Sequence, residues 1–394
     1  MNAGIVTLVI AYVLSQFYRA FLAVMTPVLS ADLGASAEDL SRASGLWFLA
    51  FALMQLPVGW ALDHIGPRRV AALLLAVGGG GGAAVFAMAT TPGHVQAAMV
   101  LIGIGCSPVL MASYYIFARI YSPRVFATLA GAVIGIGALG NIAGSLPMAW
   151  AVEALGWRAS LAGLAGATFA VAAGLWLWVR DPPSAHGAGG SKGSVFDLLK
   201  IAALWAILPL MFVNYAAAAG LRGLWAGPFL KDVYGLDASG IGAVTLVMGL
   251  AMVLGNFAYG PLDRVFGTRK WVVFTGNMAA IAALFALWAA PEAGLLRTTL
   301  LLGAIGLFGS SFPMLVAHAR SFFAPHLVGR GVTLINMFGI GGVGIFQFAS
   351  GNVFAAAKQG ATDPVAPYQA VFLFFAIPAL IGCLTYLFSR DRLD

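Results

Sequence analysis

Charge is what this sequence has least of. Charged residues make up 9% of the 394 residues and apolar residues 61%, whereas soluble domains carry roughly 25% charged residues. This composition excludes an ordinary soluble domain. A hydrocarbon layer about 30 Å thick needs ~20 apolar residues per helical span, and the sequence supplies runs of that length repeatedly. The chain is therefore predicted to be an all-α membrane protein.

Cysteine and long polar segments are scarce as well. The two cysteines, Cys106 and Cys383, both fall in apolar runs. They give no indication of a disulfide framework, and their position favours a role as small buried side chains over redox or metal chemistry. No cofactor is expected. The one sizeable polar stretch is 181–194, and its Gly, Ser and Pro content is typical of a flexible linker. A separate soluble domain is excluded by the short loops elsewhere.

The apolar runs predict twelve transmembrane helices. The first run is too long for a cleavable signal peptide and has no basic leader, so we expect a retained helix there. The predicted spans are 3–29, 42–62, 70–90, 95–118, 125–151, 158–179, 201–226, 239–262, 271–290, 297–318, 331–355 and 367–388.

Cations are distributed unevenly between the loops on the two sides of these spans. One side receives fourteen Lys and Arg residues and the other five, an asymmetry that places the richer side, with both termini, in the cytoplasm. The net charge of +7 then reflects topology and anionic lipid. We expect a multi-pass protein of the cell inner membrane, with the lipid bilayer and a small molecule as partners and no nucleic acid.

A duplicated motif divides the chain. Gly66-Pro67-Arg68-Arg69 recurs as Gly267-Thr268-Arg269-Lys270, 201 positions later, and the same displacement relates Pro27 to Pro228. An Asp precedes each basic pair, Asp63 and Asp263. One register over so long a stretch predicts two related six-helix bundles. We expect an N-terminal bundle over 1–180, a cytoplasmic linker over 181–200 and a C-terminal bundle over 201–394.

The segment Gly59-Trp-Ala-Leu-Asp63-His-Ile-Gly66-Pro-Arg68-Arg69 resembles the loop 2–3 signature of the major facilitator superfamily. The second copy departs from it by one residue in its Gly-to-Asp spacing. The resemblance implies a monomeric secondary transporter that works by rocker-switch alternating access, with its site between the halves near mid-membrane. It also implies a cytoplasmic charge network that latches one conformation, formed by Asp63, Arg68 and Arg69 and, in the second copy, by Asp263, Arg269 and Lys270.

Two arginines lie inside predicted spans. Arg19 is in the first span and Arg222 in the seventh, and the other nineteen cations are in loops or at span ends. An arginine inside a bilayer is costly and marks a functional position by default. If the halves face each other across a cavity, two guanidinium groups can converge on one carboxylate or phosphate. The organic-phosphate antiporters of the resembled superfamily likewise carry an arginine on each of these helices.

Polar residues on the same or nearby spans complete the predicted substrate site. Tyr12, Gln16 and Arg19 follow helical spacing on the first span, as Asn214 and Arg222 do on the seventh. A polar residue of this kind, taken alone, more often forms an interhelical hydrogen bond than a ligand contact. The further candidates are Gln55, Tyr114, Tyr115, Asn141, Tyr215 and Gln347.

Acidic residues are missing from the middle of every predicted span, since all fourteen fall in loops or near span ends. Proton-driven transporters often use a buried carboxylate. Without one, the arginines predict an anionic substrate, moved by exchange, by facilitated diffusion or together with a proton. His318 is the one embedded group that can titrate near neutral pH, and a structural hydrogen bond is the role favoured for it.

Other functions stay open. Met248 and Met252 form an M-x-x-x-M pair that suits Cu(I), and Met-bearing spans resemble the copper-importing branch of the superfamily; a related branch carries riboflavin. The two arginines argue against a cation, and no H-x-x-x-M partner is embedded. A non-transporting membrane scaffold is a further alternative. The sequence contains no H-E-x-x-H, no G-x-S-x-G and no embedded acid pair, so an enzyme is not expected.

Overall fold

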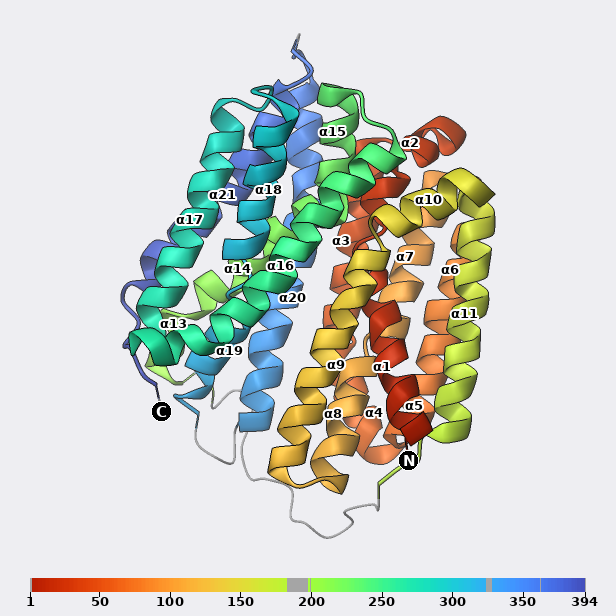
Figure 1. Ribbon diagram of the computed structural model, residues 1–394, viewed down its shortest axis with the longest axis vertical. Coiled ribbons are helices and arrows are strands. Elements are labelled where there is room, and N and C mark those ends of the chain that lie inside the picture. Colours follow the sequence, from red (N-terminus) through yellow and green to blue (C-terminus); the bar gives the residue numbers. More distant parts are fainter. Residues whose placement is uncertain (1, 183–197, 199, 324–327, 362, 394) are drawn as a thin grey trace. The chain divides into compact units, whose positions relative to one another are not determined.

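The computed structural model describes residues 2–182, 198, 200–323, 328–361 and 363–393, and this part of the chain is helical and contains no strand (Figure 1). Within these residues, ten helical segments are long and apolar enough to cross a membrane. Two helix pairs, bent by 53° and 42°, bring the number to twelve if each pair is one span. The predicted all-α membrane fold is confirmed.

The first six spans are built from twelve helical segments. Several spans consist of two segments, and one contains a π-helix. The segments are α1 (Asn2–Phe17), α2 (Leu22–Leu33), α3 (Ala37–Leu53), α4 (Gln55–His64), α5 (Pro67–Leu74), the π-helix η1 (Leu75–Gly80), α6 (Gly81–Ala87), α7 (Pro92–Cys106), α8 (Val109–Ile120), α9 (Pro123–Ala143), α10 (Leu146–Leu155) and α11 (Trp157–Trp178).

Four helices of the last six spans are at least 20 residues long. The segments are α13 (Ala202–Trp205), α14 (Leu208–Gly220), the π-helix η2 (Leu221–Trp225), α15 (Ala226–Tyr234), α16 (Ala238–Phe266), α17 (Lys270–Ala289), α18 (Leu295–Phe308), α19 (Phe312–Arg320), α20 (Val328–Lys358) and α21 (Ala366–Tyr386).

Local sequence explains where several helices begin and end. Gly34 ends α2 in the left-handed conformation, with φ +63°, which a residue without Cβ adopts at little cost. Ser36 then starts α3 with a capping box. Its hydroxyl accepts from the Asp39 N–H at 3.1 Å, and the Asp39 carboxylate accepts from the Ser36 N–H at 3.1 Å.

Glycine brings equivalent helices of the two halves into close contact with their neighbours. A Cβ added at Gly140 of α9 would collide with the carbonyl oxygen of Val13 in α1, and one added at Gly342 of α20 would collide with that of Phe212 in α14. Small residues permit this backbone approach in membranes. Spans 1 and 5 therefore pack by the same device as spans 7 and 11.

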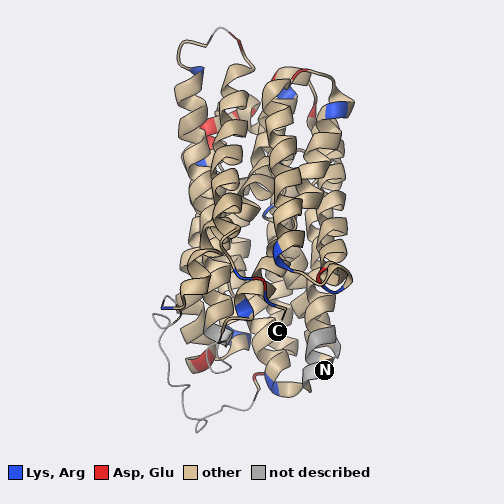
Figure 2. Cartoon of the chain, turned by 90° about the vertical axis from the view of Figure 1, so that its left-hand side faces the viewer, with Lys and Arg blue, Asp and Glu red and all other residues tan. Residues whose placement is uncertain are grey.

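The chain forms two compact units. The first consists of Met1–His186, Gly223–Lys231 and Leu236–Ala243, and the second of Gly187–Arg222, Asp232–Gly235 and Val244–Asp394. Each has its own apolar core, which includes Leu8, Val58 and Val109 in the first unit and Leu210, Ile335 and Val273 in the second. The boundary predicted at 181–200 stays a prediction, because most of that linker lies outside the described residues. Figure 2 shows charged residues mainly near helix ends, with long uncharged stretches between them.

Candidate functional site

The first span is broken at Arg19. Helix α1 ends at Phe17 and α2 begins at Leu22, with a bend of 53° between them. In the break, the Arg19 N–H donates to the Gln16 carbonyl at 3.3 Å and the Ala20 N–H to the Phe17 carbonyl at 2.9 Å. These bonds span three residues instead of four, so the backbone tightens there. The span predicted over 3–29 consists in the structure of two helical segments, with the break at Arg19.

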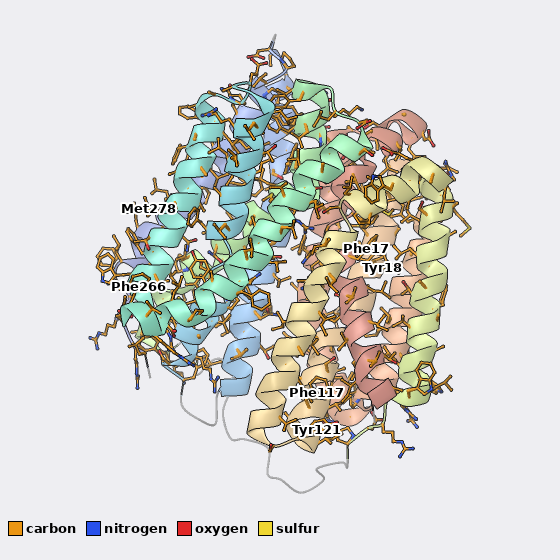
Figure 3. All side chains as sticks on the ribbon, in the orientation of Figure 1. Phe17, Tyr18, Phe117, Tyr121, Phe266 and Met278 are labelled. Carbon is orange, nitrogen blue, oxygen red and sulfur yellow. The ribbon has the colours of Figure 1, made fainter. Side chains whose placement is uncertain are left out.

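Neighbouring aromatic residues fix the direction of the break. Phe17 and Tyr18 lie side by side at the end of α1 (Figure 3), with ring centroids 5.9 Å apart. The Tyr18 hydroxyl shares a 2.8 Å hydrogen bond with Thr168 of α11. Tyr18 is thus held toward α11, and the residue after it, Arg19, is left for contacts with α3.

The Arg19 guanidinium lies against two aromatic rings of α3. Its Cζ is 5.4 Å from the ring centroid of Trp47 and 4.8 Å from that of Phe51. The two rings stack on each other, 5.2 Å apart. Cation–π contacts of this kind contribute about 0.5–2 kcal/mol each. Sequence reasoning missed Trp47 and Phe51, although their spacing of four residues on an apolar span places them on one face.

Polar atoms without a hydrogen bond gather beside Arg19. Its own Nε, the Gln16 Oε1 and the Trp47 Nε1 are buried and have no hydrogen-bond partner in the structure. The Gln16 amide nitrogen, by contrast, donates to the Tyr12 hydroxyl at 2.8 Å. Buried polar groups are nearly always paired, so this group of donors and one acceptor has the character of a site that receives a polar ligand.

Arg222 occupies a π-helix. It lies in η2, is 4% exposed, and packs against Gly249 of α16, where an added Cβ would lie 3.0 Å from the Arg222 Nε. A π-helix inside a span is uncommon and often occurs at functional sites. Both predicted arginines are therefore at backbone irregularities of their spans.

Asn214 belongs to a hydrogen-bonded cluster within the second unit. Its amide nitrogen donates to the Asn277 Oδ1 at 2.7 Å and to the Ser311 Oγ at 2.9 Å. The Asn277 amide nitrogen donates to the same Ser311 Oγ at 2.9 Å. Asn214 is 5% exposed. The cluster joins α14, α17 and Ser311, the residue before α19, which is the interhelical role that the sequence left open for Asn214.

The other predicted residues have varied surroundings. The Gln55 amide donates to the Phe51 carbonyl at 3.0 Å, and the Tyr215 ring packs on Phe312 at 5.8 Å. Gln347 is fully buried, with its Oε1 close to Gly220. Tyr114 and Asn141 are partly buried. Tyr115 lies under the Arg119 guanidinium, 3.7 Å from its Cζ, which joins it to the charged end of α8.

The first copy of the basic motif is held by two acids within its own unit. Asp63 forms an ion pair with Arg119 at 3.5 Å. Asp181 accepts from the backbone N–H of Arg68 at 2.8 Å and lies 3.9 Å from that residue's Nε. Asp181 thereby caps α5, which begins at Pro67. Arg69 is exposed.

The second copy is held more tightly. Asp263 pairs with Arg269 at 3.0 Å, and the Lys270 Nζ donates to the Leu387 carbonyl at 2.6 Å. Asp391 accepts from the Thr268 hydroxyl and from the N–H groups of Arg269 and Lys270, at 3.1 and 3.0 Å. Although burial alone would raise the pKa of Asp391, these hydrogen bonds and the charge of His318 hold that pKa below its usual range.

The partners Asp181 and Asp391 were missed by sequence reasoning. They are 210 positions apart, so the register of 201 that relates the motifs does not relate them. A signal was nevertheless present. Each belongs to an Arg-Asp dipeptide, Arg180-Asp181 and Arg390-Asp391, that closely follows the last span of its half.

His318 and the pair Met248 and Met252, which lie inside predicted spans, contact other residues of the second unit. The His318 ring nitrogens are 2.6 Å from the Tyr386 hydroxyl and 2.9 Å from the Arg390 carbonyl, which confirms the hydrogen-bonded role favoured for this histidine. Met248 and Met252 are buried and pack on Gly306 of α18. Among the described residues, no group of three or more His, Cys, Asp or Glu is placed to hold a metal ion.

Comparison with known proteins decides the family. The sequence matches the model of the Major Facilitator Superfamily over residues 8–225 and again over 207–394. The chain belongs to the Major Facilitator Superfamily. It is therefore a membrane transporter. No curated protein matches the sequence.

Solved structures of transporters share the fold. A bacterial homologue of the human lysosomal transporter Spinster, inward-facing and unoccupied, has a TM-score of 0.76 at 17% identity, covering 98% of this chain and 96% of that one. A D-xylose–proton symporter gives 0.78 at 12%, covering 98% and 97%. The nucleoside transporter NupG, in a mutant form, gives 0.76 at 16%, covering 98% and 99%. At these identities the likeness shows the fold alone.

Proposed function

We propose that this superfamily member moves a small organic anion across the inner membrane by rocker-switch alternating access, and that Arg19 and Arg222 bind the anion. The observation that carries the proposal is the surroundings of Arg19. The guanidinium is inside a membrane span, two aromatic rings cover it, and no carboxylate of the described chain forms an ion pair with it.

Energetics support an anionic ligand. An arginine within a bilayer costs at least ~2.5–3.5 kcal/mol on insertion scales, and aromatic faces offset only part of such a cost. An anion that accepts from the guanidinium would satisfy the unpaired Nε and neutralise the charge. Charge-assisted bonds to a guanidinium are shorter and about twice as strong as neutral ones. Trp47 Nε1 adds a neutral donor, and Gln16 Oε1 adds an acceptor for a ligand hydroxyl or amine.

Arg222 supports the same ligand chemistry from the second half. Arg222 lies in η2. Its side chain is buried and packs against Gly249 of α16. Spans 1 and 7 are equivalent in the duplicated fold. Two arginines at equivalent spans, each at an irregularity of the backbone, suit recognition of a carboxylate or phosphate better than recognition of a neutral solute.

Uptake by proteoliposomes tests the proposal. Candidate ligands are first found by thermal-shift screening with organic acids, phosphorylated metabolites, flavins and copper, because a ligand that binds the folded state raises the melting temperature. Uptake of the hit is then measured for wild type, Arg19→Gln and Arg42→Gln. Arg42 is exposed, lies in the same unit as Arg19 and belongs to neither the predicted site nor the predicted latch, so it is the matched control.

We expect Arg19→Gln to lower uptake by about 100-fold while the melting temperature without ligand stays near that of wild type, and Arg42→Gln to retain uptake. Wild-type uptake by Arg19→Gln, or stabilisation by neutral compounds but by no anion, would overturn the anion assignment.

A further inference from the structure

A pocket lies in the second unit, and Arg222 does not line it. Its volume is about 500 Å³, and it is bounded by the start of span 7, the end of α19 and the segment that follows α21. The lining residues are Ala202, Ala203, Ala206, Phe322, Phe388, Arg390, Asp391 and Arg392. Three alanines and two phenylalanines make most of the wall apolar, and the charged residues come from one short segment.

The acid of this segment is already engaged. Asp391 accepts three hydrogen bonds at the N-terminal end of α17, from Thr268, Arg269 and Lys270. Its negative charge is therefore directed toward that helix end, where the dipole favours an anion. The net charge that the pocket offers to a ligand comes from its two arginines.

The backbone of the two arginines is fixed, whereas their side chains are exposed. The carbonyl of Arg390 accepts from the His318 ring at 2.9 Å, and the carbonyl of Arg392 accepts from Arg269 at 3.5 Å. Both side chains are exposed. The Arg392 guanidinium lies 5.7 Å from the Phe322 ring centroid. Two cations are thus anchored at the mouth of an apolar pocket.

The exposed ring of Phe388 favours an anion with an apolar tail over a small soluble anion. Its side chain is 85% exposed, although it lies just after α21, where a span leaves the hydrocarbon. A soluble phosphate would use the arginines and leave this ring exposed. A molecule with an anionic head and an apolar tail would contact both the arginines and the ring, and anionic lipids supply that combination at the membrane surface.

We propose that the pocket formed by Ala202, Ala206, Phe388, Arg390 and Arg392 binds an anionic phospholipid, with the phosphate at the arginines and an acyl chain along Phe388 and the alanines. The bound lipid would also stabilise the end of span 12 against α17 and α19, because Arg390 and Asp391 already join those helices through His318 and the basic motif.

Native mass spectrometry of the purified full chain tests this proposal. Protein reconstituted with equal amounts of phosphatidylglycerol and phosphatidylcholine is released from the bilayer, and the retained lipids are counted. The test variant is Arg390→Gln/Arg392→Gln. The control is Arg264→Gln/Lys358→Gln, which removes the same charge from exposed positions of the same unit. The folded state is checked by the melting temperature in phosphatidylcholine.

We expect the test variant to retain at least about fivefold less phosphatidylglycerol than wild type, with phosphatidylcholine unchanged and the control near wild type. Equal retention by wild type and test variant, or an equal loss in the control, would overturn the proposal. If the double variant does not fold, Phe388→Ser replaces it and should lower phosphatidylglycerol retention in the same way.

Inorganic phosphate gives the last comparison. If it protects wild type from thermal unfolding as well as phosphatidylglycerol does, the ligand is a soluble anion and the lipid assignment is wrong.

Discussion

The first and seventh spans each hold an arginine at an irregularity of the helix, but the two irregularities are of different kinds. Span 1 is broken into α1 and α2, with a 53° bend at Arg19, whereas span 7 continues through the π-helix η2, which contains Arg222. Arg19 is partly exposed and stacked on aromatic rings, while Arg222 is buried beside a glycine. Each of the two spans thus carries an arginine at a backbone irregularity, but the local geometry that holds the arginine differs between them. The arginines are also offset, since the register of 201 relates Arg19 to Gly220.

The largest expected effect tests whether the two arginines are equivalent. Arg19→Gln and Arg222→Gln should each lower transport of the anion by about 100-fold, since a charge-assisted hydrogen bond contributes roughly 1.5–3 kcal/mol. Lysine replacements separate the two positions. Arg19→Lys should retain part of the activity, because an ammonium also binds aromatic faces, whereas Arg222→Lys should not. Initial uptake rates measure both, and equal activity of the two lysine variants would remove the distinction between the spans.

Helix packing should be the same in both halves. Gly140→Ala and Gly342→Ala each place a Cβ against a backbone carbonyl of the neighbouring span. Such overpacking costs about 1–3 kcal/mol, so both variants should melt at lower temperature than wild type. Gly131→Ala, where nothing lies within 4 Å of the added Cβ, is the control and should melt like wild type. A loss in one half only would show that the halves do not share this contact.

The two helix caps should differ in strength. Asp391 accepts from two backbone N–H groups and a hydroxyl, whereas Asp181 accepts from one backbone N–H. Loss of a cap costs about 0.5–2 kcal/mol, and Asp391→Asn should cost more than Asp181→Asn. The pKa of Asp391 is lowered in the fold. Its stabilising contribution is therefore present above the unfolded pKa and lost as pH falls through the folded one.

Thermal melts at pH 7 and at progressively lower pH measure this contribution. The difference between wild type and Asp391→Asn should shrink as the pH falls below about 4, which is the usual pKa of an aspartate. A difference that does not change with pH would mean that the carboxylate charge has no part in the cap.

The smallest effect is expected beside Arg222. Gly249→Ala introduces a Cβ 3.0 Å from the Arg222 Nε, which the long side chain can accommodate by a small shift. We expect a few-fold rise in KM for the transported anion and an unchanged melting temperature. Gly303→Ala, whose added Cβ meets only Val247 at 3.8 Å, is the control and should leave KM unchanged. An unaltered KM in Gly249→Ala would show that η2 does not depend on this contact to hold the arginine.

Most of the fold was predictable from the sequence, because the spans and the repeat rest on composition and spacing. The break at Arg19 was not. The residues at the break, Tyr18 to Phe21, include neither glycine nor proline, and the bend depends on contacts with α3 and α11 that lie far away in the sequence. The π-helix around Arg222 was not predicted either, although Gly223 lies within it. Asn214 was correctly placed on a polar face, but the sequence could not show that Asn277 and Ser311 meet it.

The bend in the first span also affects how the helices around it must pack. Helices α1 and α2 have 16 and 12 residues, about 24 and 18 Å at a rise of 1.5 Å per residue. At 53°, α2 adds only about 11 Å along the axis of α1 and displaces the chain sideways by about 14 Å. The residues around the break, among them Tyr18, Phe21 and Leu22, are at most 2% exposed. Neighbouring helices, and not lipid, must therefore accommodate this sideways displacement, so a substitution on the helices that pack on the break would move Arg19 without touching it.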